Sequence, residues 1–346
     1  MRYQTFGRRS GLRVSELVLG TANFGSAPTS AGVEGSRAIF DSFVAAGGTT
    51  FDTSSIYQAG ESERVLGTLL GHERDRFVVV TKYSASIDPQ ARPSVTGNSR
   101  KSMVRSVEDS LARLKTDYVD ILMPHFPDGI TPMAEILAGF DELIQAGKIR
   151  YGGLSNFPAW RVAGAALRSE LGSGSSVIGI QTEYSLAERS AERELLPMAE
   201  AHGLGVVMYS PLAGGLLTGK YRRGEEGRLS TSDRLHSGQR DAVLDAVLDV
   251  ASALETPPAQ IALAWLRKRA SLSATSLVPI VGPRTTAHLD GYLASLDVEL
   301  DDRHYEALET ASAIRLGAPF DDVVGALRNG ADGDRSQLTP SAIPAI

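Results

Sequence analysis

The chain has 346 residues, a formal net charge of -6 and no cysteine, with 42% hydrophobic and 22% charged residues. This composition is typical of a globular protein, and the acidic balance gives no electrostatic reason to bind nucleic acid. The lack of cysteine excludes disulfides, thiolate metal ligands and thiol nucleophiles. Residues 1–16 lack the apolar core of a signal peptide, and no apolar run approaches the roughly 18 residues of a membrane span, so we expect a cytoplasmic protein without a membrane partner.

Short apolar runs rich in β-branched residues recur along the chain, and each is followed by a stretch with helical spacing. These predicted strands cover residues 17–20, 49–53, 77–82, 117–123, 149–155, 177–183, 205–210 and 277–281. Eight such units predict an α/β fold, a closed (β/α)8 TIM barrel. An open doubly wound sheet would fit the same alternation, but a dinucleotide-binding sheet of that type needs G-x-G-x-x-G after an early strand, and the chain has no such motif.

Three regions interrupt the alternation of strands and helices. Residues 3–14 alternate around glycines like a small N-terminal hairpin that closes the bottom of the barrel. Residues 84–99 and 218–240 are long polar insertions after strands 3 and 7, on the face where barrel enzymes hold their sites, so we expect lids or substrate loops. Residues 1–316 therefore form one predicted domain, and residues 317–346, rich in Gly, Asp and Pro, form a weakly structured tail.

Polar side chains stand at or near the carboxyl end of most predicted strands. They are Asp52, Lys82, His125, Ser155, Asn156, Gln181, Tyr209 and Ser210. Each alone has an ordinary explanation, because a lysine at a strand end is usually solvated and a lone histidine usually makes a hydrogen bond in the core. In a closed barrel the strand ends form one ring, so we expect these groups to share one pocket with Tyr57 from the following loop.

Tyr57, Lys82, Asp52 and His125 together suit the protonation of a carbonyl oxygen. A phenol has an ordinary pKa of about 10, and a neighbouring lysine would lower that pKa towards the range where proton transfer is efficient. Asp52 would keep the lysine charged, and His125 would orient the substrate oxygen. Reduction of a carbonyl also needs a hydride, which no side chain provides, so a nicotinamide cofactor is implied.

These four residues, within "DTSSIYQAGESERVLG", "VVVTK" and "HFPD", resemble the aldo-keto reductase family. The resemblance runs from the hairpin to about residue 300, and it includes "GLSNF" and "SPLAGGLLTGKY". It implies an oxidoreductase that reduces an aldehyde or ketone to an alcohol with NADPH. In that function Tyr57 is the general acid and base, Lys82 and Asp52 tune it, and His125 lies beside the substrate carbonyl.

The resemblance also implies which residues hold the cofactor and the substrate. Ser155, Asn156 and Gln181 match positions that bind the carboxamide, and Tyr209 matches the ring that stacks on the nicotinamide. Further predicted cofactor contacts are Thr21, Asp52, Ser210, Pro211, Leu212, Gly214, Leu216, Lys220, Gly282, Arg284 and His288, and the run from Ser210 to Lys220 matches the pyrophosphate loop. Predicted substrate contacts are Asn23, Phe24, Tyr57, Tyr83, His125 and Phe126. No metal site is expected.

The segment "VGPRTTAHLDGY" matches the family's last cofactor motif. Arg284 would pair with a 2′-phosphate, which favours NADP(H) over NAD(H). The segment departs from the family pattern, since His288 stands where Gln is usual, and Gly291 and Tyr292 replace a Glu-Asn pair. Tyr292 could still stack on adenine, while the usual amide contacts to the base are in question.

Other functions fit the sequence less well. "GGLLTGKY" is not an NTP-binding loop, because Tyr221 stands where a magnesium-binding hydroxyl is required, and neither H-E-x-x-H nor a nucleophile elbow occurs. A Schiff-base lyase using Lys82 would leave the amide and stacking residues of the later strands without a purpose. A cofactor-sensing regulatory subunit of a membrane channel stays open, as does a ketoreductase of nucleotide-linked sugars or secondary metabolites. The sequence specifies neither the substrate nor the oligomeric state.

Overall fold

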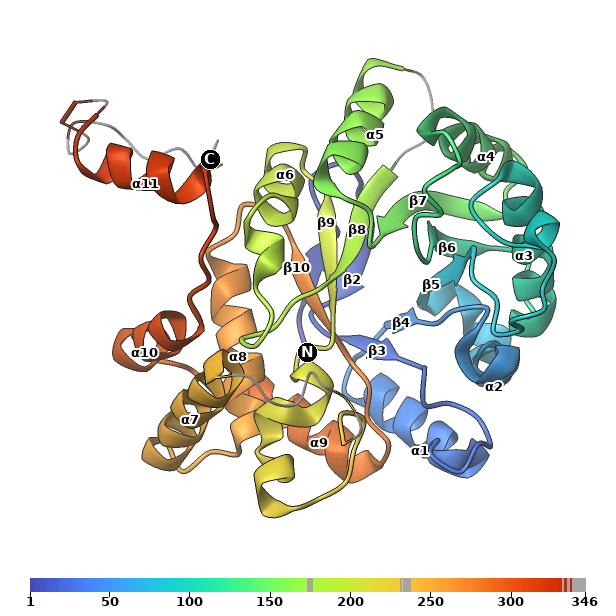
Figure 1. Ribbon diagram of the computed structural model, residues 1–346. Coiled ribbons are helices and arrows are strands. Elements are labelled where there is room, and N and C mark those ends of the chain that lie inside the picture. The colour runs from blue at the N-terminus through green and yellow to red at the C-terminus, as the bar shows by residue number, and fades with distance from the viewer. Residues whose placement is uncertain (173–176, 231, 233–237, 332, 335–336, 338–346) are drawn as a thin grey trace.

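The computed structural model, which describes residues 1–172, 177–230, 232, 238–331, 333–334 and 337, has a closed barrel of parallel strands at its centre (Figure 1). The strands in spatial order are β3 (Val18–Gly20), β4 (Thr50–Asp52), β5 (Val78–Tyr83), β6 (Val119–Pro124), β7 (Ile149–Ser155), β8 (Val177–Glu183), β9 (Gly205–Tyr209) and β10 (Leu277–Val281). The barrel closes where β10 pairs with β3, with Ile280 opposite Val18. The predicted TIM barrel is confirmed, and the open sheet is excluded.

An antiparallel hairpin of β1 (Tyr3–Thr5) and β2 (Arg13–Ser15) precedes the barrel, as predicted. Phe6 follows β1 directly, and its ring is 1% exposed among the side chains that fill the barrel. Gly179 in β8 and Gly205 in β9 make room for it, because a Cβ atom there would come within 2.3 Å and 2.5 Å of the Phe6 ring. The hairpin therefore closes the barrel at the end where the strands begin.

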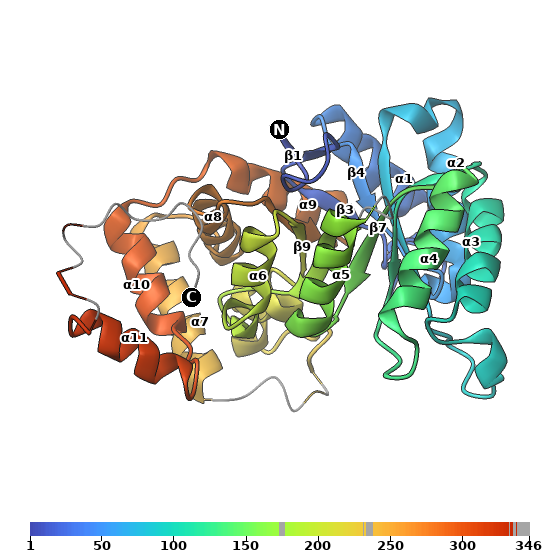
Figure 2. The same ribbon diagram turned by 90° about the horizontal axis from the view of Figure 1, so that it is seen from above.

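Helices surround the barrel and alternate with its strands (Figures 1 and 2). They are α1 (Gly32–Ala45), α2 (Glu61–Leu70), α3 (Arg100–Leu114), α4 (Met133–Gln145), α5 (Ala159–Leu171), α6 (Leu195–Ala201), α7 (Gly238–Ala253), α8 (Pro258–Ser271), α9 (Thr286–Ala294) and α10 (Asp302–Ser312). Helices α3, α4, α5, α6 and α8 pack directly on strands, whereas α7, α9 and α10 pack chiefly on other helices. In α3 the buried positions include Met103, Val107 and Leu111 at helical spacing. None of the helices in the described ranges is long and apolar enough to cross a membrane.

Both predicted long loops are present at the end of the barrel where the strands finish. The loop after β5 covers residues 84–99 and contains the short helix η3 (Pro93–Val95). It ends at Ser99, whose hydroxyl caps α3 by accepting a hydrogen bond from Ser102 N at 3.3 Å. The loop after β9 contains η5 (Ala213–Thr218) and η6 (Lys220–Arg223), and residues 231 and 233–237 of its predicted range lie outside the described residues.

The C-terminal segment contains a helix that we did not expect from the sequence. Helix α11 (Phe320–Arg328) lies at the edge of the molecule, within the tail for which we expected weak structure (Figures 1 and 2). Phe320, Val323, Val324 and Leu327 recur at helical spacing, a signal that outweighs the surrounding Gly and Asp. Residues 332, 335–336 and 338–346 lie outside the described residues, so the predicted domain boundary stays a prediction.

Candidate active site

The turn after β4 brings Tyr57 back over the end of the barrel. Asp52 is the last residue of β4, and Tyr57 opens the short helix η1 (Tyr57–Gly60). Gln58, Ala59 and Gly60 have φ values of 49°, 55° and 83°, so three successive residues adopt left-handed conformations and reverse the chain sharply. The glycine in this turn suits the last of these conformations at no steric cost.

A buried ion pair lies beneath Tyr57. The side chain of Lys82 has no exposed surface, and its Nζ donates to Oδ1 and Oδ2 of Asp52 at 2.7 Å and 2.8 Å and to the carbonyl oxygen of Thr53 at 2.8 Å. Gln181 adds a hydrogen bond from Nε2 to Asp52 Oδ2 at 2.7 Å. Every proton of the ammonium therefore has an acceptor, which is what a buried charge requires.

Tyr57 and Lys82 keep their protons in this environment. Burial raises the pKa of the Tyr57 phenol above its ordinary value of 10.0, and the positive charge of Lys82, whose Nζ lies 5.2 Å from the ring centroid, offsets this rise only in part. Burial alone would lower the pKa of Lys82, but Asp52 and Tyr57 outweigh burial and hold that pKa above its ordinary value. From the sequence we expected a lowered pKa for Tyr57. Lys82 does act in that direction, but burial outweighs it, so the expected net shift was wrong.

His125 follows β6 directly and contacts the tyrosine loop. Its Nδ1 lies 3.1 Å from Oγ of Ser54, its ring meets the Tyr57 ring edge-on at 5.8 Å between centroids, and Phe126 stacks on its face at 4.4 Å. Burial, and then the charge of Lys82, lower the pKa of His125 from 6.5 to about 3. The imidazole is therefore neutral across the pH range in which most enzymes work.

Residues at the ends of β7, β8 and β9 join this centre through hydrogen bonds. Asn156, in a left-handed conformation with φ 62°, donates from Nδ2 to the carbonyl oxygen of His125 at 3.0 Å. Its Oδ1 accepts from the hydroxyl of Tyr209 at 2.9 Å, and its Nδ2 also lies 3.1 Å from Ser155 Oγ. Asn156, Gln181 and Tyr209, predicted from strand ends, therefore meet at one rim, while the contact from Gln181 to Asp52 was not anticipated.

The loop after β9 is shaped by left-handed residues. Ser210, Ala213, Gly214 and Gly215 have φ values of 54°, 49°, 67° and 92°. Within this loop Ala213 N and Gly215 N donate to the carbonyl oxygens of Ser210 and Leu212 at 2.8 Å and 2.9 Å, so an anion such as a pyrophosphate would be bound by other N–H groups of the loop. Leu212 and Leu216, also predicted here, are 8% and 2% exposed, so they offer backbone rather than side-chain contacts.

The chain after η6 folds back over this loop and holds its shape. The hydroxyl of Tyr221 donates to the carbonyl oxygen of Gly214 at 2.8 Å and accepts from Leu229 N at 2.9 Å. Lys220 Nζ donates to the carbonyl oxygen of Glu226 at 3.1 Å. Tyr221 thus fastens Leu229, and Lys220 fastens Glu226, onto the loop after β9.

Three basic side chains gather where β10 leads into α9. Burial, and then the charges of Lys220 and Arg284, lower the pKa of His288 below 6.5. Arg284 and His288 are exposed, and Thr285 caps α9 by accepting from His288 N at 3.2 Å. The charged Lys220 and Arg284 beside a helix N-terminus form a donor set that suits a phosphate, and the uncharged ring of His288 can add one N–H. These residues therefore fit the adenosine end of a phosphorylated dinucleotide.

Four other predicted site residues occupy supporting positions. Thr21 is buried, with Oγ1 donating to the carbonyl oxygen of Asp52 at 3.1 Å, and Asn23 donates from Nδ2 to the carbonyl oxygen of Gly282 at 3.1 Å. Phe24 is 0% exposed and Tyr83 is 1% exposed, with the Tyr83 hydroxyl donating to the carbonyl oxygen of Asn98 at 3.3 Å. Phe24 and Tyr83 thus support the site from within, and their contact with a substrate stays a prediction.

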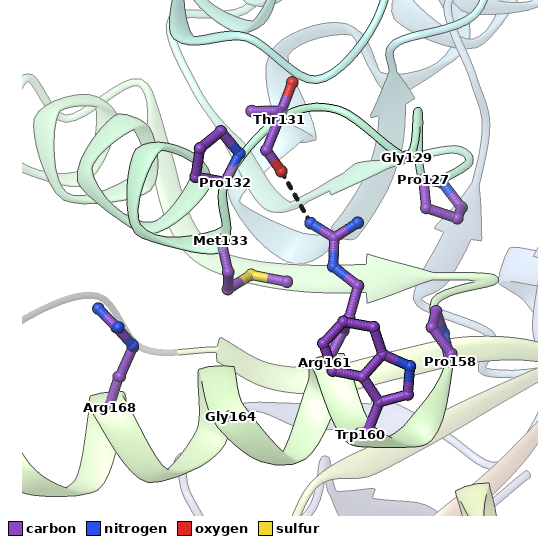
Figure 3. Close-up of a pocket in the computed structure, with 10 residues that line it drawn as sticks. All are labelled: Pro127, Gly129, Thr131, Pro132, Met133, Pro158, Trp160, Arg161, Gly164 and Arg168. Atoms are coloured by element: carbon purple, nitrogen blue, oxygen red, sulfur yellow. Dashed lines mark hydrogen bonds between the residues drawn. The ribbon is translucent and has the colours of Figure 1, made fainter.

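A surface groove of about 600 Å³ lies beside this site, between the loop after β6 and α5 (Figure 3). Trp160 is 75% exposed at its rim, and Arg161 reaches across it to donate to the carbonyl oxygen of Thr131 at 2.8 Å. None of the residues that line this groove is among the predicted site residues. The groove is therefore a separate feature of the same end of the barrel.

Comparisons with known proteins agree with this fold and site. The sequence model described as "Aldo/keto reductase family" matches residues 16–313. The uncharacterized oxidoreductase YrpG of Bacillus subtilis (strain 168) is 36% identical over 87% of this chain and 93% of that protein. Norsolorinic acid reductase B of Dothistroma septosporum is 32% identical over 97% of this chain and 88% of its own length. A putative voltage-gated potassium channel subunit beta of Schizosaccharomyces pombe is 35% identical, over 78% of this chain and 82% of its own length.

The buried ion pair should stabilise the fold only as a pair. Lys82→Met leaves the Asp52 carboxylate buried without its cation, so we expect the free energy of unfolding to fall by about 3 to 5 kcal/mol. The double variant Lys82→Met/Asp52→Asn buries no unpaired charge and should be more stable than Lys82→Met alone. Urea denaturation of both single variants and the double variant measures this coupling. Two losses that simply add in the double variant would contradict it.

The buried neutral imidazole should make stability depend on pH. With a pKa of 6.5 unfolded and about 3 folded, His125 contributes stability above pH 6.5 that is lost as the pH falls towards 3, because only the unfolded chain takes up the proton. Between pH 7 and pH 4 the wild type should therefore lose about 2 to 3 kcal/mol more than His125→Asn. Urea denaturation at both pH values is the measurement, and equal losses would show that His125 is protonated in the folded protein.

Proposed function

The chain belongs to the aldo/keto reductase family, and we propose that it reduces an aldehyde or ketone to an alcohol, with a proton from Tyr57 and a hydride from NADPH. As a member of this family it is an oxidoreductase that acts on carbonyl groups, and such enzymes generally use NAD(P)H. The proposal rests chiefly on one observation, the phenol of Tyr57 held above the Lys82–Asp52 pair and beside a neutral His125.

The side chains support a simple division of roles. A raised pKa keeps the proton on Tyr57 until the substrate oxygen gains negative charge, and that oxygen then takes it. The phenolate left behind is stabilised by the nearby ammonium of Lys82, which Asp52 keeps charged and in place. His125 can donate an N–H to the same oxygen and so orient the carbonyl for attack. The nicotinamide, when bound, supplies the hydride, and the phenolate recovers its proton from water.

The residues proposed to hold the cofactor lie on one path across the end of the barrel. The path begins at Gln181 and Asn156, passes Tyr209 and the left-handed loop after β9, and ends at the cations around Arg284. A dinucleotide laid along it would place its carboxamide among amides, its pyrophosphate on backbone N–H groups and a 2′-phosphate near Arg284. This order supports the proposal of NADP(H) over NAD(H).

The aromatic side chain beside His125 narrows the class of substrates to test. Phe126 is 48% exposed and stacked on the imidazole, so it offers an aromatic face next to the proposed carbonyl position. We therefore propose aryl aldehydes and aryl ketones as the first substrates to test, with simple aldehydes, sugar ketones and nucleotide-linked sugars in the same panel. Loss of the near-ultraviolet absorbance of NADPH reports turnover. Cofactor binding without turnover of any carbonyl would favour the alternative of a regulatory subunit, and the Schizosaccharomyces pombe relative is named as a putative voltage-gated potassium channel subunit beta.

The proposed role of Tyr57 as the acid can be tested by removing its hydroxyl oxygen. Tyr57→Phe removes only the hydroxyl, and because a positioned acid typically contributes about 10² to 10⁴ in rate, kcat should fall by that factor while the Kd for NADPH stays unchanged. Tyr118→Phe is the matched control, since that hydroxyl bonds to Asp75 on the outside of the barrel. Steady-state kinetics and fluorescence titration give both quantities. Equal turnover by the Tyr57 variant would remove this residue from the mechanism.

Cofactor selectivity should depend on Arg284. Loss of a charge-assisted contact to a 2′-phosphate costs about 1.5 to 3 kcal/mol, so Arg284→Ala should raise the Kd for NADPH roughly ten- to a hundredfold. The Kd for NADH should hardly change, since NADH lacks that phosphate. Arg303→Ala, an exposed arginine on α10, is the control. Fluorescence titration with both cofactors is the measurement, and parallel weakening of NADH and NADPH would assign the phosphate to other residues.

A further inference from the structure

We infer that Ser54 is a positioning residue that selects the tautomer of His125, so that Nδ1 accepts a hydrogen bond and Nε2 carries the single proton. The tautomer assignment stands on the geometry of Ser54 and His125 alone. Its use, donation of the Nε2 proton to the oxygen of a substrate carbonyl, rests on the proposed function.

The hydroxyl of Ser54 has His125 as its main hydrogen-bond partner. It is 0% exposed, two residues beyond the end of β4, and its Oγ lies 3.1 Å from Nδ1 of His125. The backbone N–H of Ile56 points at the same Oγ from 3.5 Å, a long and weak approach. Within the described residues no other hydrogen bond involves this hydroxyl. Ser54 was not among the predicted site residues, because a serine in "DTSSIY" has no signal that separates it from an ordinary turn residue.

The number of hydrogens that each group carries decides whether Ser54 Oγ or His125 Nδ1 is the donor. If the Ser54 hydroxyl donates to Nδ1, its one hydrogen is used, and its lone pairs remain free to accept from Ile56. If Nδ1 carried the proton and donated instead, the hydroxyl hydrogen of Ser54 would be buried with no acceptor among the described residues, and Oγ would face two N–H donors. An unsatisfied buried donor costs about 1 to 3 kcal/mol, so the first arrangement is favoured roughly tenfold or more.

Only a neutral imidazole has two tautomers, so the protonation state of His125 decides whether Ser54 can select one of them. A protonated imidazole would carry a hydrogen on both nitrogens and have no tautomer to select. Burial, and then Lys82, hold the pKa of His125 at about 3, so only one nitrogen carries a hydrogen at neutral pH. With Nδ1 used as an acceptor, that nitrogen is Nε2.

The ring is also held in one orientation. Phe126 stacks on its face with planes 5° apart, and the backbone of His125 is fixed at both ends, by its N–H to the carbonyl oxygen of Tyr83 at 2.8 Å and by Asn156 Nδ2 at its own carbonyl oxygen. A half-turn of the ring would replace Nδ1 by a carbon and lose the bond to Ser54. No hydrogen bond from the described residues reaches Nε2, so its N–H is available to a substrate.

Ser54 connects the two groups proposed to act on the substrate oxygen. Its carbonyl oxygen accepts the backbone N–H of Tyr57 at 3.1 Å, while its hydroxyl holds the imidazole. The same residue therefore sets the position of the proposed acid and the direction of the proposed N–H donor. Both act on one oxygen, so their relative placement matters for the reaction.

The tautomer can be read directly without cofactor or substrate. Protein labelled with ¹⁵N in its histidine rings gives distinct signals for a protonated and an unprotonated ring nitrogen, and His125→Asn identifies the signals of residue 125. We expect the wild type near neutral pH to show His125 with unprotonated Nδ1 and protonated Nε2. A protonated Nδ1, or an equal mixture of the two tautomers, overturns the inference whether or not any variant folds.

Variants then test whether Ser54 is the cause. In Ser54→Ala the Nδ1 partner is lost, so we expect a mixture of tautomers, a roughly tenfold fall in kcat/KM for a carbonyl substrate, and an unchanged Kd for NADPH. Ser36→Ala is the matched control, since it removes another buried hydroxyl, which donates to Gly32 within α1 at 2.6 Å. An unchanged tautomer in Ser54→Ala would refute the selecting role.

The two proposals fail in different ways. A shift of tautomer in Ser54→Ala without any change in kcat/KM supports the assignment of the proton and contradicts its use on the substrate. A wild type that turns over no carbonyl contradicts the proposed function, and the ring-nitrogen spectrum still decides the tautomer. Ser54→Cys retains a weaker donor and should lie between the wild type and Ser54→Ala in tautomer population.

Discussion

Lys82 and Asp52 carry opposite charges inside the barrel. A single unpaired charge there would have a desolvation cost that takes up a large part of the free energy of folding. The pair is tolerated because its ammonium has three acceptors and its carboxylate has a further donor in Gln181. These contacts require the ends of β4, β5 and β8 to be held at fixed separations. The closed barrel provides this, since each strand is hydrogen-bonded on both sides.

The same burial acts in opposite directions on the two proton-bearing groups above the pair. Desolvation disfavours a charged form, so it raises the pKa of the Tyr57 phenol and lowers the pKa of the His125 imidazole. Both groups are therefore neutral at the start of the proposed reaction, and each has a hydrogen to offer an oxygen that becomes negative. The charge of Lys82 favours loss of the proton from Tyr57 and opposes gain of a proton by His125, which keeps their roles distinct.

A hydrogen-bonded chain extends this centre around the rim. From Ser54 it passes through His125 to Asn156 and on to Tyr209, so residues from four different strand ends are fixed relative to one another. Such a chain suits a site in which a carbonyl, an acid and a hydride donor must meet within a fraction of an ångström. The loop after β9 continues the rim, where left-handed residues and the contacts of Tyr221 define its path.

Local patterns in the sequence determined the strands, the hairpin, the long loops and the strand-end residues, because apolar periodicity and strand ends are properties of neighbouring residues. The same patterns did not specify the bond from Gln181 to Asp52, the burial of Phe24 and Tyr83, or the contact of Ser54 with His125. Nor did they give the direction of the Tyr57 pKa, which depends on how completely water is excluded. These features arise between segments far apart in the chain, and only the closed barrel sets their distances and their desolvation. The sequence therefore determined which groups reach the rim, and the tertiary structure decided which protons they hold and which partners they face.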